Sequence, residues 1–114
     1  MNTIKYNNLN LREGQLMLDL GCGEGRHSIG AFLETPASIL GMDLSFEDLK
    51  IAQSRLKDFD TSELSTSCTF GLGNIDDIPL KDSSLDAVIC SEVLEHVDSP
   101  NESVRELVRV LKPG

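Results

Sequence analysis

The chain has 114 residues, of which 39% are hydrophobic and 25% charged, so one small globular domain is expected rather than a disordered chain. Its formal net charge of −9 and its scattered basic residues argue against binding to nucleic acid or to an anionic membrane, because both need a basic footprint. Three cysteines without metal-ligand spacing, and no stretch typical of a signal peptide or membrane span, predict reduced thiols, no metal site and a cytoplasmic location.

Apolar runs of strand length alternate with segments of helical periodicity along the chain. Residues 15–20 are predicted to form a first strand that stops at glycine, and residues 26–34 a helix that ends before Pro36. Residues 38–43 are predicted to form a second strand that ends on Asp43. The buried face of the helix is expected to contain Ile29, Phe32 and Leu33.

A second helix is predicted to begin after Ser45, because Ser45 and Asp48 fit a capping box in which Asp replaces the usual Glu. The polar residues 60–67 are expected to form a mobile loop, and residues 68–73 a third strand that contains two glycines. The buried stripe of the helix is expected to contain Phe46, Leu49, Ala52, Leu56 and Phe59.

Residues 74–84 are predicted to form a loop, and the nearly all-apolar residues 85–91 a fourth strand that is covered on both faces. A last helix is predicted to have Ser99 as its N-cap, Pro100 at its first position and Glu102 at its third. Its buried stripe is expected to contain Val104, Leu107, Val108 and Leu111.

This alternation of strands and helices predicts an α/β fold with a parallel sheet, because neighbouring parallel strands need a crossover connection. In such sheets ligands bind beyond the carboxyl ends of the strands, where the strand order reverses. Polar residues stand at the carboxyl ends of the strands here. Strands can also end in polar turns that bind no ligand. Several polar strand ends beside a glycine-rich loop nevertheless favour a binding site. The residues are Asp19, Asp43, Asn74, Cys90 and Ser91.

The glycine-rich loop is the sequence LDLGCGEG, residues 18–25. Alternating glycines allow a tight turn and a close approach of the backbone to a ligand. Arg26 stands where a dinucleotide-binding G-x-G-x-x-G loop would have Gly or Ala. Asp43 nevertheless follows Gly23 by about 20 residues, the distance typical of an acid that binds a ribose.

The charge of Asp19 helps to distinguish between ligands. A carboxylate shortly before the glycine turn would repel a pyrophosphate and attract a cation. S-adenosylmethionine combines an adenosine, which suits Asp43, with a sulfonium and an ammonium group, so the charge favours it over a dinucleotide. In the alternative interpretation, Asp19 points away from the ligand and caps the turn.

The sequence resembles class I S-adenosylmethionine-dependent methyltransferases at several places in order, in the small-molecule branch (methyltransferase type 11-like). LDLGCGEG (18–25) looks like the first motif of the family, and ILGMDLS (39–45) is similar to the second. GNIDDIPLKDSSLDAVICSEVLEHV (73–97) resembles the signature of the small-molecule branch, and RELVRVLKPG (105–114) is similar to the segment that enters the fifth strand. The resemblance covers roughly residues 15–114 and implies a Rossmann-like parallel sheet with helices on both faces, about four strands of a larger family sheet.

The resemblance assigns the methionine end of the cofactor to the glycine loop. Asp19 and the backbone of Gly21, Cys22 and Gly23 would hold the ammonium group. Gly25 would let the following helix pack closely. From the residues alone, Cys22 and Cys90 are interpreted as small space-filling residues rather than nucleophiles.

The resemblance assigns the adenosine end to the next two strand ends. Asp43 would accept both ribose hydroxyls, and Leu44 would lie against adenine. Asn74 stands where the family usually has Asp, and its side-chain oxygen can still accept from the adenine amino group, with weaker recognition. The Ile75 N–H would donate to the ring, and Cys90 and Ser91 would line the methionine end.

No residue is assigned as catalytic. His96 has a pKa suited to a general base and follows Glu92 and Glu95, which could fix its tautomer. The more frequent alternative is a packed, hydrogen-bonded histidine. His27 is expected to be structural or solvent-facing.

The leading interpretation is S-adenosylmethionine-dependent methyl transfer to a small-molecule or lipid-like acceptor. Residues 1–114 would be the N-terminal, incomplete portion of the domain, a fragment of a longer protein. The first alternative is a non-catalytic module or degenerate fragment that binds the cofactor, or keeps only the fold. The second is a nicotinamide dehydrogenase fragment, which Arg26 and Asp19 argue against. The fourth strand would have an exposed apolar edge, which invites self-association or pairing with a partner chain.

Overall fold

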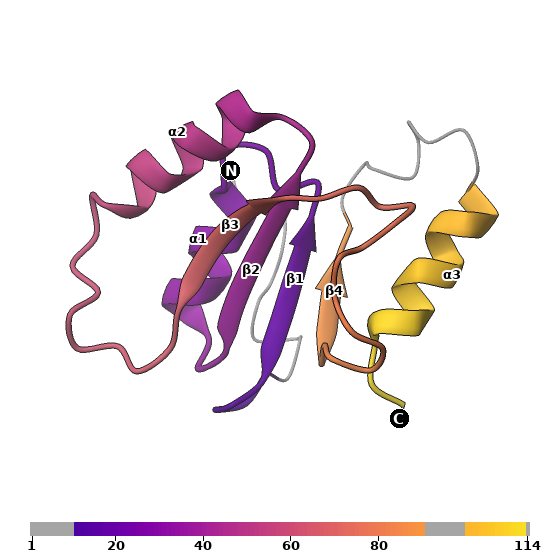
Figure 1. Ribbon diagram of the computed structural model, residues 1–114. Helices are drawn as coiled ribbons and strands as arrows, with labels where there is room; N and C mark the ends of the chain where they lie inside the picture. Colours follow the sequence, from indigo (N-terminus) through magenta and orange to yellow (C-terminus); the bar gives the residue numbers. More distant parts are fainter. Residues whose placement is uncertain (1–10, 91–99, 114) are drawn as a thin grey trace.

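The computed structural model describes residues 11–90 and 100–113, and Figure 1 shows their arrangement. The predicted elements are present, with strand ends that differ by at most two residues from the prediction; Ser91 and the predicted N-cap Ser99 lie outside the described residues. The elements are β1 (Leu16–Leu20), α1 (Arg26–Glu34), β2 (Ser38–Asp43), α2 (Phe46–Leu56), β3 (Cys68–Leu72), β4 (Ala87–Ile89) and α3 (Pro100–Val110).

The four strands form one parallel sheet in the order β3-β2-β1-β4 (Figure 1). The chain adds β2 and β3 on one side of β1, and then returns to place β4 on the other side. The strand order therefore reverses between β1 and β4. In open α/β sheets the crevice beyond the carboxyl ends at such a reversal is where ligands bind. The glycine-rich loop, which follows β1, lies at this reversal.

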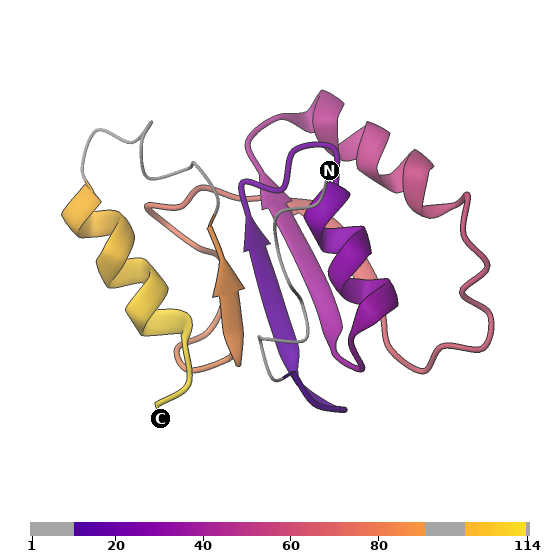
Figure 2. The ribbon, with the colours of Figure 1, turned by 180° about the vertical axis from the view of Figure 1, so that it is seen from behind.

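Helices cover both faces of the sheet, which confirms the predicted fold class. Because neighbouring residues of a strand face opposite sides, Met17 belongs to one hydrophobic cluster and Leu18 to the other. The first cluster includes Phe32 of α1 and lies under α1 and α2 (Figure 2). The second includes Val110 of α3 and the loop between β3 and β4. β4 contributes to both clusters, as expected for a strand covered on both faces.

The buried faces of α1 and α2 are narrower than predicted. Leu33 is 41% exposed and Phe46 is 59% exposed, and Phe59 is also exposed, so these three predictions were wrong. In α1 the small residues Ser28 and Ala31 take part in the buried face, which turns Leu33 toward solvent. Phe46 is the first residue of α2 and Phe59 follows its end, where periodicity no longer reports burial. The other predicted positions of these two helices, Ile29, Phe32, Leu49, Ala52 and Leu56, are buried or half-buried.

The buried face of α3 is rotated relative to the prediction. Val104 is exposed and Val108 is 66% exposed, whereas Ser103 and Val110 are fully buried. The Ser103 hydroxyl donates to Asp76 Oδ1 at 2.6 Å, so a polar contact occupies a position where hydrophobic periodicity expects an apolar side chain. The remaining predicted positions, Leu107 and Leu111, are half-buried against the second cluster.

β4 forms an edge of the described sheet, as predicted, and it is shorter than residues 85–91. Leu85 instead forms an isolated parallel bridge with Leu111. Its N–H donates to the Val110 carbonyl (2.9 Å), and its carbonyl accepts from the Lys112 N–H (2.8 Å). Among the described residues, no helix has the length and apolar character needed to cross a membrane.

Candidate functional site

The strand register gathers the predicted binding residues at one edge of the sheet. Leu20 pairs with Met42, and Asp43 pairs with Leu72, so β1, β2 and β3 end side by side. The loops that follow these strands, and Cys90 after β4, therefore lie at the same carboxyl edge (Figure 1). The structure thus brings the described predicted site residues to the edge where ligands bind in this class of sheet.

Gly25 is the N-cap of α1 and has a positive φ of 85°. A Cβ atom built there would lie 2.8 Å from the Ala52 Cβ and 3.1 Å from the Phe70 ring. Both the backbone conformation and the space therefore require glycine at this position. The start of α1 is packed directly against α2 and β3, which is the close packing expected of Gly25.

Gly23, in the middle of the loop, has a positive φ of 54°, but a Cβ atom there would meet nothing within 4 Å. Its backbone faces open space, where a ligand can approach. Its N–H is fixed, because it donates to Asp43 Oδ2 at 2.8 Å.

The Asp43 carboxylate joins two segments at the edge of the sheet. Besides the Gly23 N–H at Oδ2, it accepts the Ser45 N–H at Oδ1, at 2.9 Å. Ser45 in turn caps α2, since its hydroxyl accepts the Asp48 N–H at 3.2 Å. The capping box is therefore only half formed: Asp43, not Asp48, binds the Ser45 N–H. Each Asp43 oxygen has one such bond and can accept another.

Asp19 is 2% exposed, and its Oδ2 accepts the hydroxyl proton of the fully buried Ser28 at 2.7 Å. Burial raises the pKa of Asp19, while the Ser28 hydroxyl and the charge of His27 act in the opposite direction. Sequence reasoning missed Ser28, because a single serine within an apolar helix face has no distinctive pattern. The hydrogen bond directs the carboxylate toward α1.

The backbone N–H groups of the glycine loop donate to acceptors other than Asp19. The N–H groups of Gly21 and Cys22 donate to the Met42 carbonyl at 2.8 and 2.9 Å, and that of Gly23 donates to Asp43. The buried carboxylate before the loop therefore does not cap the glycine turn through any of these amides. An ammonium group needs acceptors, and among the described residues the Gly21 carbonyl has no hydrogen bond. The Gly21 carbonyl is thus free to accept a hydrogen bond from a ligand.

The loop after β3 presents one acceptor and one donor. Asn74 is exposed, and its Oδ1 accepts the Asp76 N–H at 2.9 Å, an Asx turn that leaves one lone pair. The Ile75 side chain is buried in the second cluster, while its N–H has no acceptor among the described residues. Leu44 is 70% exposed after β2 and offers an apolar surface at the same edge.

The cysteines of this region do not have the properties of nucleophiles. Burial, with the nearby charge of Asp19, raises the pKa of Cys22 and of Cys68 to about 12 and also raises that of Cys90. The thiols therefore stay protonated at neutral pH, and only thiolates are reactive. His96 lies outside the described residues, so the general-base hypothesis for it stays a prediction.

Residues 18–114 match the family of methyltransferase domains. The chain belongs to this family. Norajmaline N-methyltransferase from Rauvolfia serpentina is 34% identical to this methyltransferase domain over 98 residues, which cover 86% of the chain and 32% of the relative. Ubiquinone biosynthesis O-methyltransferase from Paracidovorax citrulli is 32% identical over 102 residues, covering 90% and 41%.

The fold agrees with a solved relative. Phosphoethanolamine N-methyltransferase 2 from Haemonchus contortus, solved with phosphomonomethylethanolamine and S-adenosylhomocysteine, superposes with a TM-score of 0.78 at 28% identity. The match covers 91% of the present chain and 24% of that protein. The methyltransferase domain described here thus spans less than half of the length of these three proteins.

S-adenosylmethionine is the methyl donor of this family. The residues present fit such a ligand. The Asp43 oxygens and the Gly21 carbonyl can accept hydrogen bonds, the Ile75 N–H can donate one, and the backbone of Gly23 borders open space. No positively charged side chain is required for a ligand whose methionine end is itself cationic.

Proposed function

We propose that this chain is the N-terminal, cofactor-binding portion of an S-adenosylmethionine-dependent methyltransferase that acts on a small-molecule or lipid-like acceptor. The observation that carries the proposal is the Asp43 carboxylate, which two backbone N–H groups fix beside an open glycine loop at the reversal of strand order. A fixed carboxylate at this place is what recognition of a ribose diol needs.

In this proposal the two ends of the cofactor bind different loops. The free lone pairs of Asp43 accept the ribose hydroxyls, and Leu44 lies against the base. Asn74 Oδ1 and the Ile75 N–H bind the polar edge of the base. The methionine end lies over the glycine loop, where the Gly21 carbonyl accepts from its ammonium group and the buried Asp19 adds its negative charge.

The chain contributes position and environment to the transfer step. When bound, S-adenosylmethionine supplies an electrophilic methyl group on a sulfonium that leaves as a neutral thioether. The fixed carboxylates orient the donor, which lowers the entropic cost of bringing donor and acceptor together. The buried, preorganised polar groups around Asp19 replace water near the reacting charge. A general base is required only for an acceptor that loses a proton.

The names of the relatives support the proposed acceptor class. Two of the names refer to norajmaline and to phosphoethanolamine, and the third refers to ubiquinone biosynthesis. These names point to small or lipid-like compounds. The free state of the three cysteines supports the proposed cytoplasmic location.

Calorimetry with S-adenosylhomocysteine, and NADH as the control ligand, tests the cofactor. Saturable binding of the first compound and not of the second is expected. A thermal scan at about 100 times the dissociation constant should show roughly 2.7 kcal/mol of added stability. Absence of binding by a chain that unfolds cooperatively would refute the cofactor assignment.

Variants test the site. Asp43→Ala should weaken binding by at least about tenfold, since each hydrogen bond to a charged group contributes about 1.5–3 kcal/mol. Asp58→Ala removes an equal charge from an exposed position after α2 and is the matched control. His96→Ala should have a much smaller effect than Asp43→Ala, and the reverse order would contradict the site. Methylated product with any acceptor, detected by mass spectrometry, would exclude the non-catalytic alternative.

A further inference from the structure

Two side chains of α3 hold the loop between β3 and β4. The Ser103 hydroxyl donates to Asp76 Oδ1 at 2.6 Å, and Glu106 Oε1 accepts the Ile78 N–H at 2.8 Å. Ser103 and Glu106 lie about one helical turn apart, so both side chains project from the same side of α3 and contact this loop. Ser103 is fully buried, and Ile78 is buried in the second cluster.

Arg109, a further turn along α3, uses all five of its N–H donors within the same region. Nε donates to Glu106 Oε2 (2.6 Å), and Nη2 donates to Glu106 Oε1 (3.0 Å) and to the Ile78 carbonyl (2.8 Å). Nη1 donates to the Leu80 carbonyl and to Asp82 Oδ1, both at 2.8 Å. The planar guanidinium fits this set of acceptors, and an ammonium with three donors cannot replace it fully. Ser103, Glu106 and Arg109 are called the α3 clamp below.

The α3 clamp acts on the segment that directly follows the proposed base-binding residues. Asp76 connects the two: its side chain accepts from Ser103, while its N–H donates to Asn74 Oδ1. The orientation of the Asn74 carboxamide is thereby coupled to α3. The coupling matters for an asparagine in particular. A carboxamide that rotates freely can present either an oxygen or an NH₂ group to a base, whereas a carboxylate can only accept.

We propose that the α3 clamp positions the base-binding loop and so gives the site its preference for adenine over a 6-oxopurine. The proposal rests on the proposed function. The Asp76 N–H holds the Asn74 oxygen as an acceptor, which suits the 6-amino group of adenine and not the 6-carbonyl of hypoxanthine. The Ile75 N–H is held in place by its neighbours on either side. The members of the α3 clamp are positioning residues, because none of them needs to touch the ligand.

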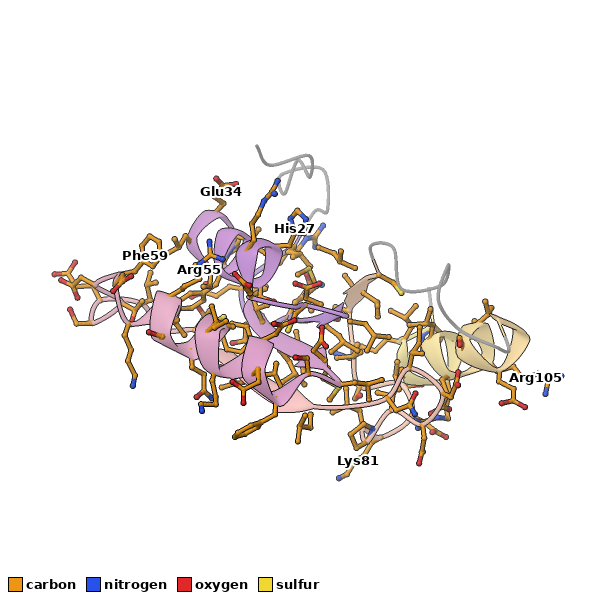
Figure 3. All side chains as sticks on the ribbon, turned by 90° about the horizontal axis from the view of Figure 1, so that it is seen from above. His27, Glu34, Arg55, Phe59, Lys81 and Arg105 are labelled. Carbon is orange, nitrogen blue, oxygen red and sulfur yellow. The ribbon has the colours of Figure 1, made fainter. Side chains whose placement is uncertain are left out.

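The test compares two ligands and two arginines of α3. Wild-type chain should bind S-adenosylhomocysteine at least tenfold more tightly than S-inosylhomocysteine, in which a 6-carbonyl replaces the 6-amino group and N1 carries a proton. Arg109→Lys should reduce this ratio severalfold, mainly through weaker binding of S-adenosylhomocysteine. Arg105→Lys is the matched control, because Arg105 is exposed and points away from the molecule (Figure 3). It should leave the ratio unchanged.

Hydrogen exchange gives a readout without ligand. The amides of Asp76 and Ile78 should exchange at least tenfold faster in Arg109→Lys than in Arg105→Lys. Ser103→Ala is a milder second variant, since it keeps all Arg109 bonds, and it should lower the ligand ratio in the same direction if Arg109→Lys does not fold. A wild-type ratio in a folded Arg109→Lys or Ser103→Ala chain would overturn the α3 clamp proposal alone. Failure of wild-type chain to bind either compound would overturn the proposed function. The proposed role of the α3 clamp in base recognition would then fall with it.

Discussion

Replacing Gly25 with alanine should destabilise the chain more than the same change at another glycine of like conformation. Gly25 has a φ of 85° and begins α1. Gly14, in the turn before β1, has a φ of 83°. The two substitutions remove the same freedom from the unfolded chain and impose the same backbone conformation on alanine. They differ in what the new methyl group would contact.

The structure gives the magnitude of the difference. Alanine in the left-handed region costs about 1–2 kcal/mol at either site. At Gly14 the methyl group meets nothing within 4 Å. At Gly25 it would lie 2.8 Å from the Ala52 Cβ and 3.1 Å from the Phe70 ring, and overpacking of this kind costs about 1–3 kcal/mol. Gly25→Ala should therefore cost about 2–5 kcal/mol in total, a large part of the stability of a small domain.

Chemical denaturation of the two variants measures this difference directly. We expect the free energy of unfolding of Gly25→Ala to be lower than that of Gly14→Ala by about 1–3 kcal/mol, with unchanged denaturant dependence. In a thermal scan this corresponds to a melting temperature lower by at least about 4 °C. Equal stabilities of the two variants would show that α1 does not begin in contact with α2 and β3, and the reasoning about the loop would be refuted.

Three further predictions concern titratable groups. Asp19→Asn should keep or raise the free energy of unfolding at pH 7, because the raised pKa of Asp19 makes its ionised form costly in the folded chain once the pH exceeds that pKa. The same variant should weaken S-adenosylmethionine binding. A clearly lower free energy of unfolding in urea would contradict the first expectation. Hydrogen bonds from the Leu16 N–H and from Arg109 are the main causes that lower the pKa values of Asp86 and Glu106, respectively. The stability that these two carboxylates give to the fold is therefore complete above their ordinary pKa values of 3.8 and 4.5, and it is lost as the pH falls through the lowered pKa values. The urea midpoint should accordingly fall below about pH 5, and less so in Glu106→Gln. The thiols of Cys22 and Cys68, whose pKa is raised to about 12, should react with iodoacetamide at pH 7.5 at least about a hundredfold more slowly in the folded chain than in urea, and fast alkylation of either cysteine would contradict the raised pKa.

The order and bounds of the elements could be predicted because each depends on local pattern. The apolar run before Gly21 and the cap at Ser45 are readable within a few residues, and both α1 and β2 have the predicted bounds. The parallel sheet followed from the alternation of elements. The edge position of β4 followed from the resemblance to a larger family sheet.

The orientation of side chains could not be predicted where a distant polar partner decides it. Hydrophobic periodicity assigned Val104 and Val108 to the buried face of α3, but the bond from Ser103 to Asp76 turns that face. Asp19 was equally ambiguous, since only the position of Ser28 in the folded chain shows which way the carboxylate points. In both cases the partners are separated in sequence and are brought together only by packing.

The two bonds that Asp43 makes within the protein change what its mutation would measure. The carboxylate holds the glycine loop and the start of α2 in register before any ligand arrives, so the site is preformed and little ordering remains to be done on binding. Removing the side chain therefore frees the Gly23 and Ser45 amides as well as deleting the proposed ribose acceptor. The affinity lost in Asp43→Ala is the sum of a missing contact and a loosened loop, and the two can be separated only by comparing ligands with and without the ribose hydroxyls.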